Sequence, residues 1–179
     1  MLTTDTTLAV VIDFQEKMMP VIRNQEDIIK KSATFIEGCR LLGVPVLITQ
    51  QYTKGLGETV APIKQALLDF EPIEKISFSC YDSEEFYDKL KAHEKNSVFI
   101  LGVESHICVQ QTVLDLLPYD YDVHVLADCV GSRFETDFHY AIRRMEHAGA
   151  KITTAESALF AMMQRADHPR RKEITNLVK

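Results

Sequence analysis

Residues 7–13, with the sequence TLAVVID, form a nearly continuous apolar run that ends in an acidic residue. An apolar run without alternating polar positions is typical of a strand buried on both faces, as in parallel sheets. The run therefore predicts a parallel strand with Asp13 at its carboxyl end.

The rest of the chain alternates between apolar runs and amphipathic segments. We expect five further strands, at residues 45–49, 73–78, 97–102, 122–127 and 150–154. We expect helices at residues 24–42, 60–70, 83–93, 107–117, 136–148, 159–165 and 170–178, the first with Asn24 as its N-cap and Gly43 as its C-terminal cap. This alternation predicts an α/β fold: a three-layer αβα sandwich around a six-stranded parallel sheet, with right-handed crossovers and a Rossmann-like topology.

Length and composition are those of an ordinary globular protein. The chain has 179 residues, of which 46% are hydrophobic and 26% charged, so we expect a single domain over residues 1–179. This composition excludes disordered and collagen-like chains. No apolar run approaches the roughly 18 residues of a membrane helix, and we expect no membrane partner.

Charge and cysteine usage indicate the surroundings of the protein. The net charge is −6 and the basic residues are spread out, which makes nucleic acid a poor candidate partner. The first residues lack the basic region of a secretory signal. The four cysteines show no CxxC spacing, so we expect free thiols and a cytoplasmic location.

Three residues at predicted strand ends form a possible nucleophilic site. Ligands of parallel sheets bind beyond the carboxyl ends of the strands, where Asp13, Lys75 and Cys108 are expected. Taken singly, Asp13 suits a loop cap, Lys75 a solvated lysine and Cys108 a core thiol. Together a carboxylate, an ammonium and a thiol suit covalent catalysis.

Each of the three groups has a possible chemical role. Cys108 is expected in the first turn of a helix, and with Lys75 nearby we expect it to have a depressed pKa and to be the most reactive thiol. Asp13 would accept the thiol proton and return it to a leaving group. Backbone N–H groups at the turn before the helix would stabilise an oxyanion.

The chain resembles the isochorismatase-like cysteine hydrolases, which include nicotinamidases and N-carbamoylsarcosine amidases. The matching segments are VVIDFQ around Asp13, EKISFS around Lys75 and LGVESHICVQQT around Cys108. The segments ITQQYTKGLGET and DHPRRKEI look closest to the isochorismatase-domain-containing subgroup. The resemblance implies an Asp–Lys–Cys triad of Asp13, Lys75 and Cys108.

The resemblance also implies an oxyanion hole and an assembly. Family members have a cis peptide before the turn to the nucleophile, which here would join Val103 to Glu104. Its implied role is to aim the N–H of Glu104 at the same point as the N–H of Cys108. Family members usually associate, so we expect a homo-oligomer.

The chain also departs from its relatives. Nicotinamidases carry an Asp-x-His metal motif after the second strand, where this chain has Gln50, Gln51 and Tyr52. The six histidines show no metal-binding spacing, so we expect no metal and no cofactor. True isochorismatases lack the nucleophilic cysteine, so Cys108 argues against their vinyl ether cleavage.

Residues near the predicted strand ends are candidates for binding substrate, and each could equally belong to the core: Phe14, Gln15, Gln50, Tyr52 and Phe78. Residues 50–59, with two glycines, suggest a flexible lid. Asp128 is expected to end the fifth strand as a structural turn acid, and Arg133 to lie on a solvated surface.

These observations favour a cysteine hydrolase that cleaves an amide-like C–N bond in a small-molecule substrate through a thioester on Cys108. One alternative is a non-catalytic binding or scaffold protein on the same fold. The other is a thiol redox protein that uses Cys108 without acyl transfer. The identity of the substrate does not follow from the sequence, because small pockets discriminate by single contacts.

Overall fold

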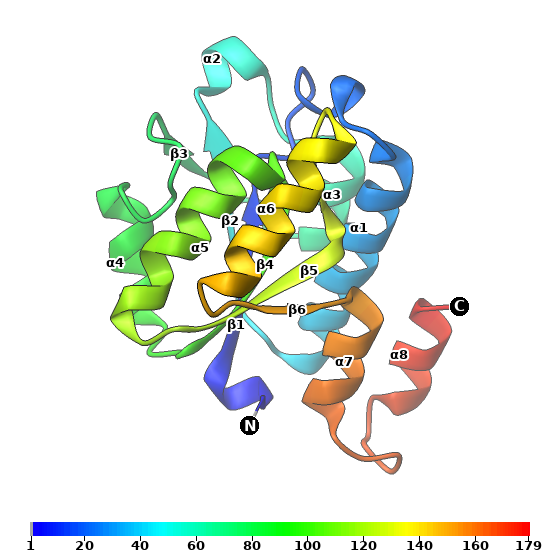
Figure 1. The fold of residues 1–179 in the computed structure, drawn as a ribbon. Coiled ribbons are helices and arrows are strands. Elements are labelled where there is room, and N and C mark those ends of the chain that lie inside the picture. The colour runs from blue at the N-terminus through cyan, green and yellow to red at the C-terminus, as the bar shows by residue number, and fades with distance from the viewer. Residues whose placement is uncertain (1) are drawn as a thin grey trace.

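Parallel strands form one sheet at the centre of the computed structural model, which describes residues 2–179 (Figure 1). The six strands of this part of the chain are β1 (Thr7–Ile12), β2 (Val46–Gln51), β3 (Ile73–Lys75), β4 (Ser97–Val103), β5 (Asp122–Gly131) and β6 (Lys151–Thr153). Their order in the sheet is β3-β2-β1-β4-β5-β6, and every pairing is parallel. The order reverses between β1 and β4, which is where such folds form a ligand crevice.

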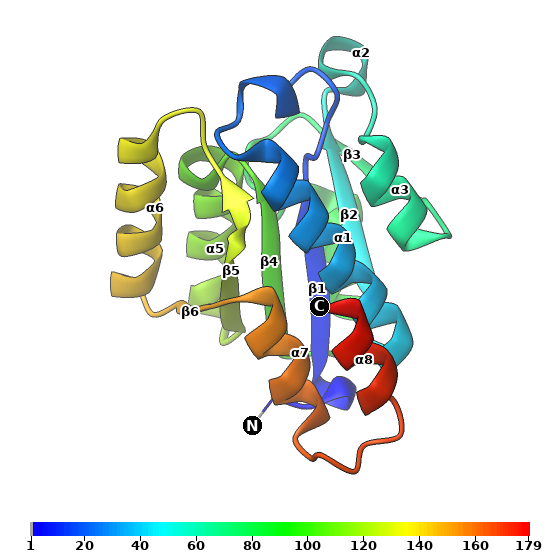
Figure 2. The ribbon, with the colours of Figure 1, turned by 90° about the vertical axis from the view of Figure 1, so that its right-hand side faces the viewer.

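Helices cover both faces of the sheet, as the two views show (Figures 1 and 2). The core on one face includes α1 (Gln25–Leu42), α3 (Ala61–Leu67), α7 (Ala155–Met163) and α8 (Arg171–Leu177). The core on the other face includes α4 (Glu84–Ala92), α5 (Gln110–Leu116) and α6 (Glu135–His147). A short helix, α2 (Thr53–Leu56), follows β2. This arrangement confirms the predicted three-layer α/β sandwich.

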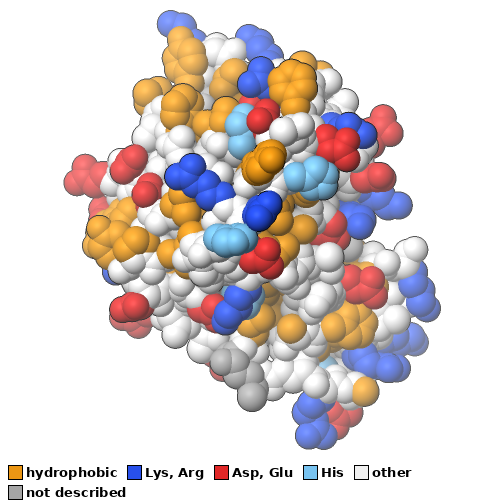
Figure 3. Space-filling model, viewed as in Figure 1, with side chains coloured by type: hydrophobic (Ala, Val, Ile, Leu, Met, Phe, Trp, Pro, Cys, Tyr) orange, Lys and Arg blue, Asp and Glu red, His pale blue; other side chains and the backbone are white. Residues whose placement is uncertain are grey.

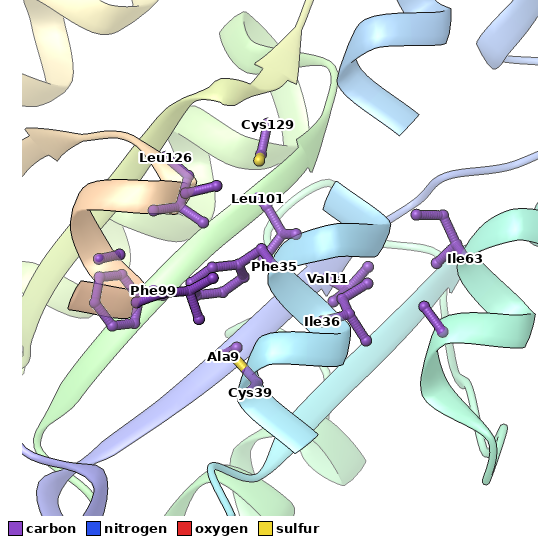
Figure 4. Close-up of a cluster of buried hydrophobic side chains, with 14 of the residues drawn as sticks. Ala9, Val11, Phe35, Ile36, Cys39, Ile63, Phe99, Leu101, Leu126 and Cys129 are labelled. Carbon is purple, nitrogen blue, oxygen red and sulfur yellow. The ribbon is translucent and has the colours of Figure 1, made fainter. Parts of the chain in front are cut away.

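The first strand is buried on both faces, as its apolar run predicts. All six residues of β1 are buried, and the five apolar ones, residues 8–12, alternate between the two cores. Ala9 and Val11 face α1, whose Phe35 and Ile36 lie over them (Figure 4). Full burial of a large apolar side chain contributes about 1.5–3 kcal/mol, so this packing stabilises the strand that carries Asp13.

Several predicted boundaries are wrong by a few residues. The third strand ends at Lys75 rather than residue 78, because the chain turns so that the carbonyls of Ser77 and Phe78 accept hydrogen bonds from Lys75. The second strand continues to Gln51, and the fifth continues to Gly131 after a register shift against β4. Asp128 therefore lies inside β5 rather than at its end.

The ends of two helices also differ from the prediction. Asn24 precedes α1 but adopts a left-handed conformation, and its side chain makes no capping hydrogen bond. Gly43 does cap the helix, with its N–H donating to Arg40 and Cys39 carbonyls. The helix α7 begins at Ala155, earlier than predicted, and its first N–H donates to Asp128 Oδ1 at 2.9 Å. Asp128 therefore has a structural role, but at the start of α7 rather than in a turn at the end of β5.

None of the helices within residues 2–179 has the length and apolar character needed to cross a membrane.

Candidate active site

Asp13 follows β1 at the carboxyl edge of the sheet and is completely buried. Its backbone N–H donates to the Thr49 carbonyl at 3.3 Å, which continues the pairing with β2 by one residue. Both carboxylate oxygens have partners: Oδ1 accepts a 2.8 Å hydrogen bond from Thr49 Oγ1, and Oδ2 accepts one of 2.7 Å from Lys75 Nζ. This carboxylate is part of a buried polar network rather than a cap of the loop.

Lys75 is buried at the end of β3, so it is not the solvated lysine of the alternative interpretation. Its ammonium donates to Asp13 Oδ2, to Gln51 Oε1 at 2.7 Å, and to the carbonyls of Ser77 and Phe78 at 3.2 and 3.1 Å. Burial alone would lower the pKa of Lys75, but the negative charge of Asp13, together with that of the Cys80 and Cys108 thiols in their ionised form, outweighs burial and raises the pKa. The lysine is therefore protonated at neutral pH.

Cys108 lies after the end of β4. Gly102 brings that strand very close to β1, since a Cβ atom at this residue would collide with the backbone of Ile12, and its φ of +138° suits glycine. The peptide bond between Val103 and Glu104 is cis. A π-helical turn over Ser105–Val109 then leads into α5, with Val109 N–H donating to the Glu104 carbonyl at 3.3 Å.

The charges of Asp13 and Lys75 both influence the pKa of the Cys108 thiol. Burial, with only 3% of the residue exposed, is the largest influence and raises the pKa of the thiol. The Asp13 carboxylate raises this pKa further, while Lys75 lowers it by less than the other two influences raise it. The expectation of a depressed pKa is therefore wrong, and the resting thiol is neutral.

Glu104 is buried between the ends of β4 and β5. Its Oε2 accepts hydrogen bonds from the backbone N–H of Arg133 at 3.0 Å and from the Arg133 guanidinium at 3.1 Å. Arg133, expected on a solvated surface, is half-exposed and ties the loop after β5 to the turn before Cys108.

Three of the five substrate-binding candidates make structural contacts within the protein. Phe14 is completely buried in the core that includes α1. Gln15 donates to the carbonyls of Gln51 and Gly57 and accepts from the Gln51 N–H. Gln50 donates to Thr53 and accepts from Thr59. These contacts of Gln15 and Gln50 tie residues 53–59 to the strand ends.

Tyr52 and Phe78, the other two candidates, are about half-exposed, at 48% and 54%. Tyr52 lies at the start of α2, and its ring lies so close to Gly55 that a side chain there would collide with it. Phe78 follows β3, and its carbonyl accepts from Lys75. Both aromatic rings are thus available for contacts beyond the strand ends.

Four further residues complete the network around Asp13, Lys75 and Cys108, and sequence reasoning missed them: Thr49, Gln51, Cys80 and Thr112. Thr112 Oγ1 donates to the Cys108 carbonyl at 2.7 Å and accepts from the Cys80 N–H at 2.9 Å. The spacing of these residues in the sequence could have identified them. Thr112 lies one helical turn after Cys108, and Thr49 and Gln51 are two residues apart on the strand next to Asp13.

Two other features lie apart from the triad. Within residues 2–179, no three or more His, Cys, Asp or Glu side chains are grouped so that they could hold a metal ion. A cavity of about 270 Å³ lies between the starts of α1 and α6 and the end of β5. Its lining includes Arg23, Asp27 and Glu135 but none of the triad residues.

Comparison with known proteins agrees with this architecture. The isochorismatase domain model matches residues 7–157. The chain is 39% identical over 176 residues to isochorismatase domain-containing protein 1 of Salmo salar, covering 97% of this chain and 61% of the relative. It thus spans about three fifths of the length of that relative, and the same holds for the Danio rerio protein of this name, at 59%.

Solved structures share the fold over nearly the whole chain. The MAR1 ribonuclease structure from Caenorhabditis elegans aligns with a TM-score of 0.93 at 38% identity, covering 99% of this chain and 91% of that one. The YcaC gene product of Escherichia coli, described as an octameric hydrolase of unknown specificity, aligns with a TM-score of 0.89 at 23% identity, covering 98% and 86%. The family model covers most of the chain, and the chain therefore belongs to the isochorismatase family.

Proposed function

We propose that this protein is a cysteine hydrolase that cleaves an amide-like C–N bond in a small molecule through a thioester on Cys108. The observation that carries the proposal is the buried ion pair of Asp13 and Lys75, 2.7 Å apart, at the carboxyl ends of the strands, where its charges influence the Cys108 thiol. A carboxylate that accepts a proton and a thiol that attacks a carbonyl are together sufficient for acyl transfer.

Acylation begins from a neutral thiol. As the substrate carbonyl approaches, Asp13 takes the proton of Cys108 and the sulfur bonds to the carbonyl carbon. The N–H groups of Glu104 and Cys108 stabilise the oxyanion. Lys75 keeps the cluster electrically balanced, because its positive charge offsets the negative charge that moves from Asp13 to the sulfur and then to the oxyanion.

The tetrahedral intermediate collapses when Asp13 returns the proton to the leaving nitrogen. The C–N bond breaks, an amine leaves, and an acyl group stays on Cys108 as a thioester. Asp13 then takes a proton from water, and the resulting hydroxide attacks the thioester carbonyl. The C–S bond breaks, the acid leaves, and Asp13 returns the proton to the sulfur to restore the free thiol. The net reaction consumes one water molecule and needs no electron transfer.

The test is an activity screen of the wild type and Cys108→Ala against small amides, carbamoyl compounds and ureides. We expect at least one compound to be hydrolysed by the wild type alone, with an acyl adduct on Cys108 in mass spectra. Cys39→Ala, which changes a thiol on the buried face of α1, is the matched control and should keep turnover. Equal turnover by Cys108→Ala would contradict the proposal.

Ribonuclease activity is a second candidate, because the Caenorhabditis elegans relative is named a ribonuclease. The net charge of −6 argues against it, since phosphate backbones bind to positive surfaces. On the face in Figure 3, basic and acidic side chains are intermixed rather than gathered into one basic area. Incubation of labelled RNA with the wild type and Cys108→Ala decides between the two, and we expect no Cys108-dependent cleavage of RNA.

We also propose that the chain forms a homo-oligomer. The octameric neighbour with the same fold supports this proposal, and so do large apolar side chains left exposed, among them Phe134 at 63% and Tyr140 at 67%. Light scattering after size-exclusion chromatography tests it, and a mass of one chain at micromolar concentration would contradict it.

A further inference from the structure

The strand β2 lies between the strand that carries Asp13 and the strand that carries Lys75. Thr49 pairs with Ile12, the residue before Asp13, and Gln51 pairs with Lys75 itself. Residues two apart on a strand point to the same face of a sheet. Thr49 and Gln51 therefore both point toward the triad, one beside each member of the ion pair.

Thr49 holds the carboxylate of Asp13. Its buried hydroxyl donates to Oδ1 at 2.8 Å, while Lys75 donates to Oδ2 at 2.7 Å, so both oxygens of the carboxylate are fixed. A hydroxyl has a single proton, and here Asp13 receives it. The other side of the Thr49 oxygen faces Cys80 Sγ at 3.8 Å.

Gln51 holds the ammonium of Lys75. Its Nε2 donates to the Ile76 carbonyl at 2.7 Å, which leaves Oε1 to accept from Lys75 Nζ at 2.7 Å. The backbone N–H of Gln51 is itself held by Gln15 Oε1 at 2.7 Å. The amide thus supplies an acceptor for the lysine without adding a second carboxylate to the site, so the charges of Asp13 and Lys75 remain balanced.

We propose that Thr49 and Gln51 are positioning residues that hold the Asp13 carboxylate and the Lys75 ammonium in the orientation needed for acyl transfer to Cys108. This inference rests on the proposed function. Neither residue reacts in the proposed steps. Thr49 acts through the Asp13 carboxylate and Gln51 through the Lys75 ammonium, because each makes a hydrogen bond with that buried charge.

The test uses 4-nitrophenyl acetate, whose acetyl group is transferred to the Cys108 sulfur while 4-nitrophenol takes up the thiol proton. The rate of the nitrophenol burst measures acylation. We expect Thr49→Val, which keeps the shape and removes the hydroxyl, to slow the burst about tenfold or more, the usual effect of losing a hydrogen bond to a charged group. Thr49→Ser keeps the hydroxyl and should stay within about twofold of the wild type.

If Thr49 had only a structural role, the burst would be slower in Thr49→Ser than in Thr49→Val. The residue is completely buried, so Ser would leave a small void while Val would preserve the packing. Gln51 offers a second pair for the case that Thr49→Val does not fold. Gln51→Glu keeps an oxygen for Lys75 and should acylate faster than Gln51→Met, although an added buried carboxylate is the poorer choice for packing alone.

The possible outcomes separate the two proposals. If the wild type shows no burst, or if the burst persists in Cys108→Ala, the proposed function fails and this inference fails with it. If the Cys108-dependent burst is present and Thr49→Val and Gln51→Met both acylate at the wild-type rate, only the positioning role is overturned. A burst rate that follows the retained hydroxyl at residue 49 and the retained oxygen at residue 51 supports it.

Discussion

The ammonium of Lys75 lies 2.7 Å from the carboxylate of Asp13, and both side chains are fully buried. The two charges compensate each other, so the thiol of Cys108 faces a pair of zero net charge rather than a free cation. Breaking such a pair leaves one charge buried without a partner, which is costly for stability. Variants of the two residues should therefore differ in both reactivity and stability.

Lys75→Met should slow the alkylation of Cys108 by iodoacetamide at neutral pH. Lys75 is the charge that lowers the pKa of this thiol, so its removal raises the pKa further and reduces the thiolate fraction. The free energy of unfolding should fall by about 3–5 kcal/mol, because Asp13 loses its buried partner. Lys54→Met, at an exposed lysine of α2, is the control. A wild-type alkylation rate in Lys75→Met would show that the ammonium does not act on the thiol.

Asp13→Asn should leave alkylation of Cys108 comparable or faster while it abolishes turnover. The carboxylate raises the pKa of the thiol, so a neutral amide removes that unfavourable influence. Turnover should fall by a factor of about 10² or more, the usual size of general acid–base effects. Alkylation by mass spectrometry and hydrolysis of any substrate that depends on Cys108 are measured side by side. Full turnover by Asp13→Asn on such a substrate contradicts the proposed mechanism.

The sheet and the positions of Asp13, Lys75 and Cys108 near strand ends could be predicted, because both follow from local patterns. The apolar run before Asp13 and the run that leads to Gly102 are continuous, and the carboxyl ends of parallel strands meet at one edge. The end of β3 could not be predicted, since it depends on carbonyls that turn toward the Lys75 ammonium.

The direction of the Cys108 pKa shift could not be predicted either. The position near a helix start and the nearby lysine both favour a low pKa, but burial is the largest influence in the folded chain. Burial depends on packing between distant segments. In addition, the Lys75 ammonium already donates hydrogen bonds to Asp13 and Gln51. Nearby charges alone therefore predict a Cys108 pKa shift in the wrong direction.

Asp128→Ala should lower the free energy of unfolding by about 1 kcal/mol, a typical cost of losing an acceptor at a helix start. Asp128 Oδ1 accepts from the first N–H of α7 at 2.9 Å, and that N–H would lose its partner. Urea denaturation measures the change. The control is Lys31→Ala, which removes only the 3.3 Å ion pair with Asp128 and should cost a few tenths of a kcal/mol. Equal losses in the two variants would mean that the ion pair, not the helix start, is the stabilising contact.

The protein should lose stability as the pH rises above about 9, through its buried thiols. Burial raises the pKa of Cys80 to about 11 and raises the pKa of Cys39 and Cys129 as well. The unfolded chain releases these protons near the ordinary thiol pKa of about 8.5, whereas the folded chain keeps them. The unfolded state then binds fewer protons, so the free energy of unfolding falls, by up to about 1.4 kcal/mol per pH unit for each thiol.

Cys39 gives the sharpest test of this pH dependence, because burial alone raises its pKa. Cys39→Ala creates a small cavity that lowers stability equally at every pH, but it removes one titrating thiol. Urea denaturation under reducing conditions between pH 8 and 10 should therefore give a shallower slope for the variant. This range ends below the raised pKa of Lys75, whose contribution is lost only at higher pH. Parallel slopes for the wild type and Cys39→Ala would mean that this thiol ionises alike in the folded and unfolded chain.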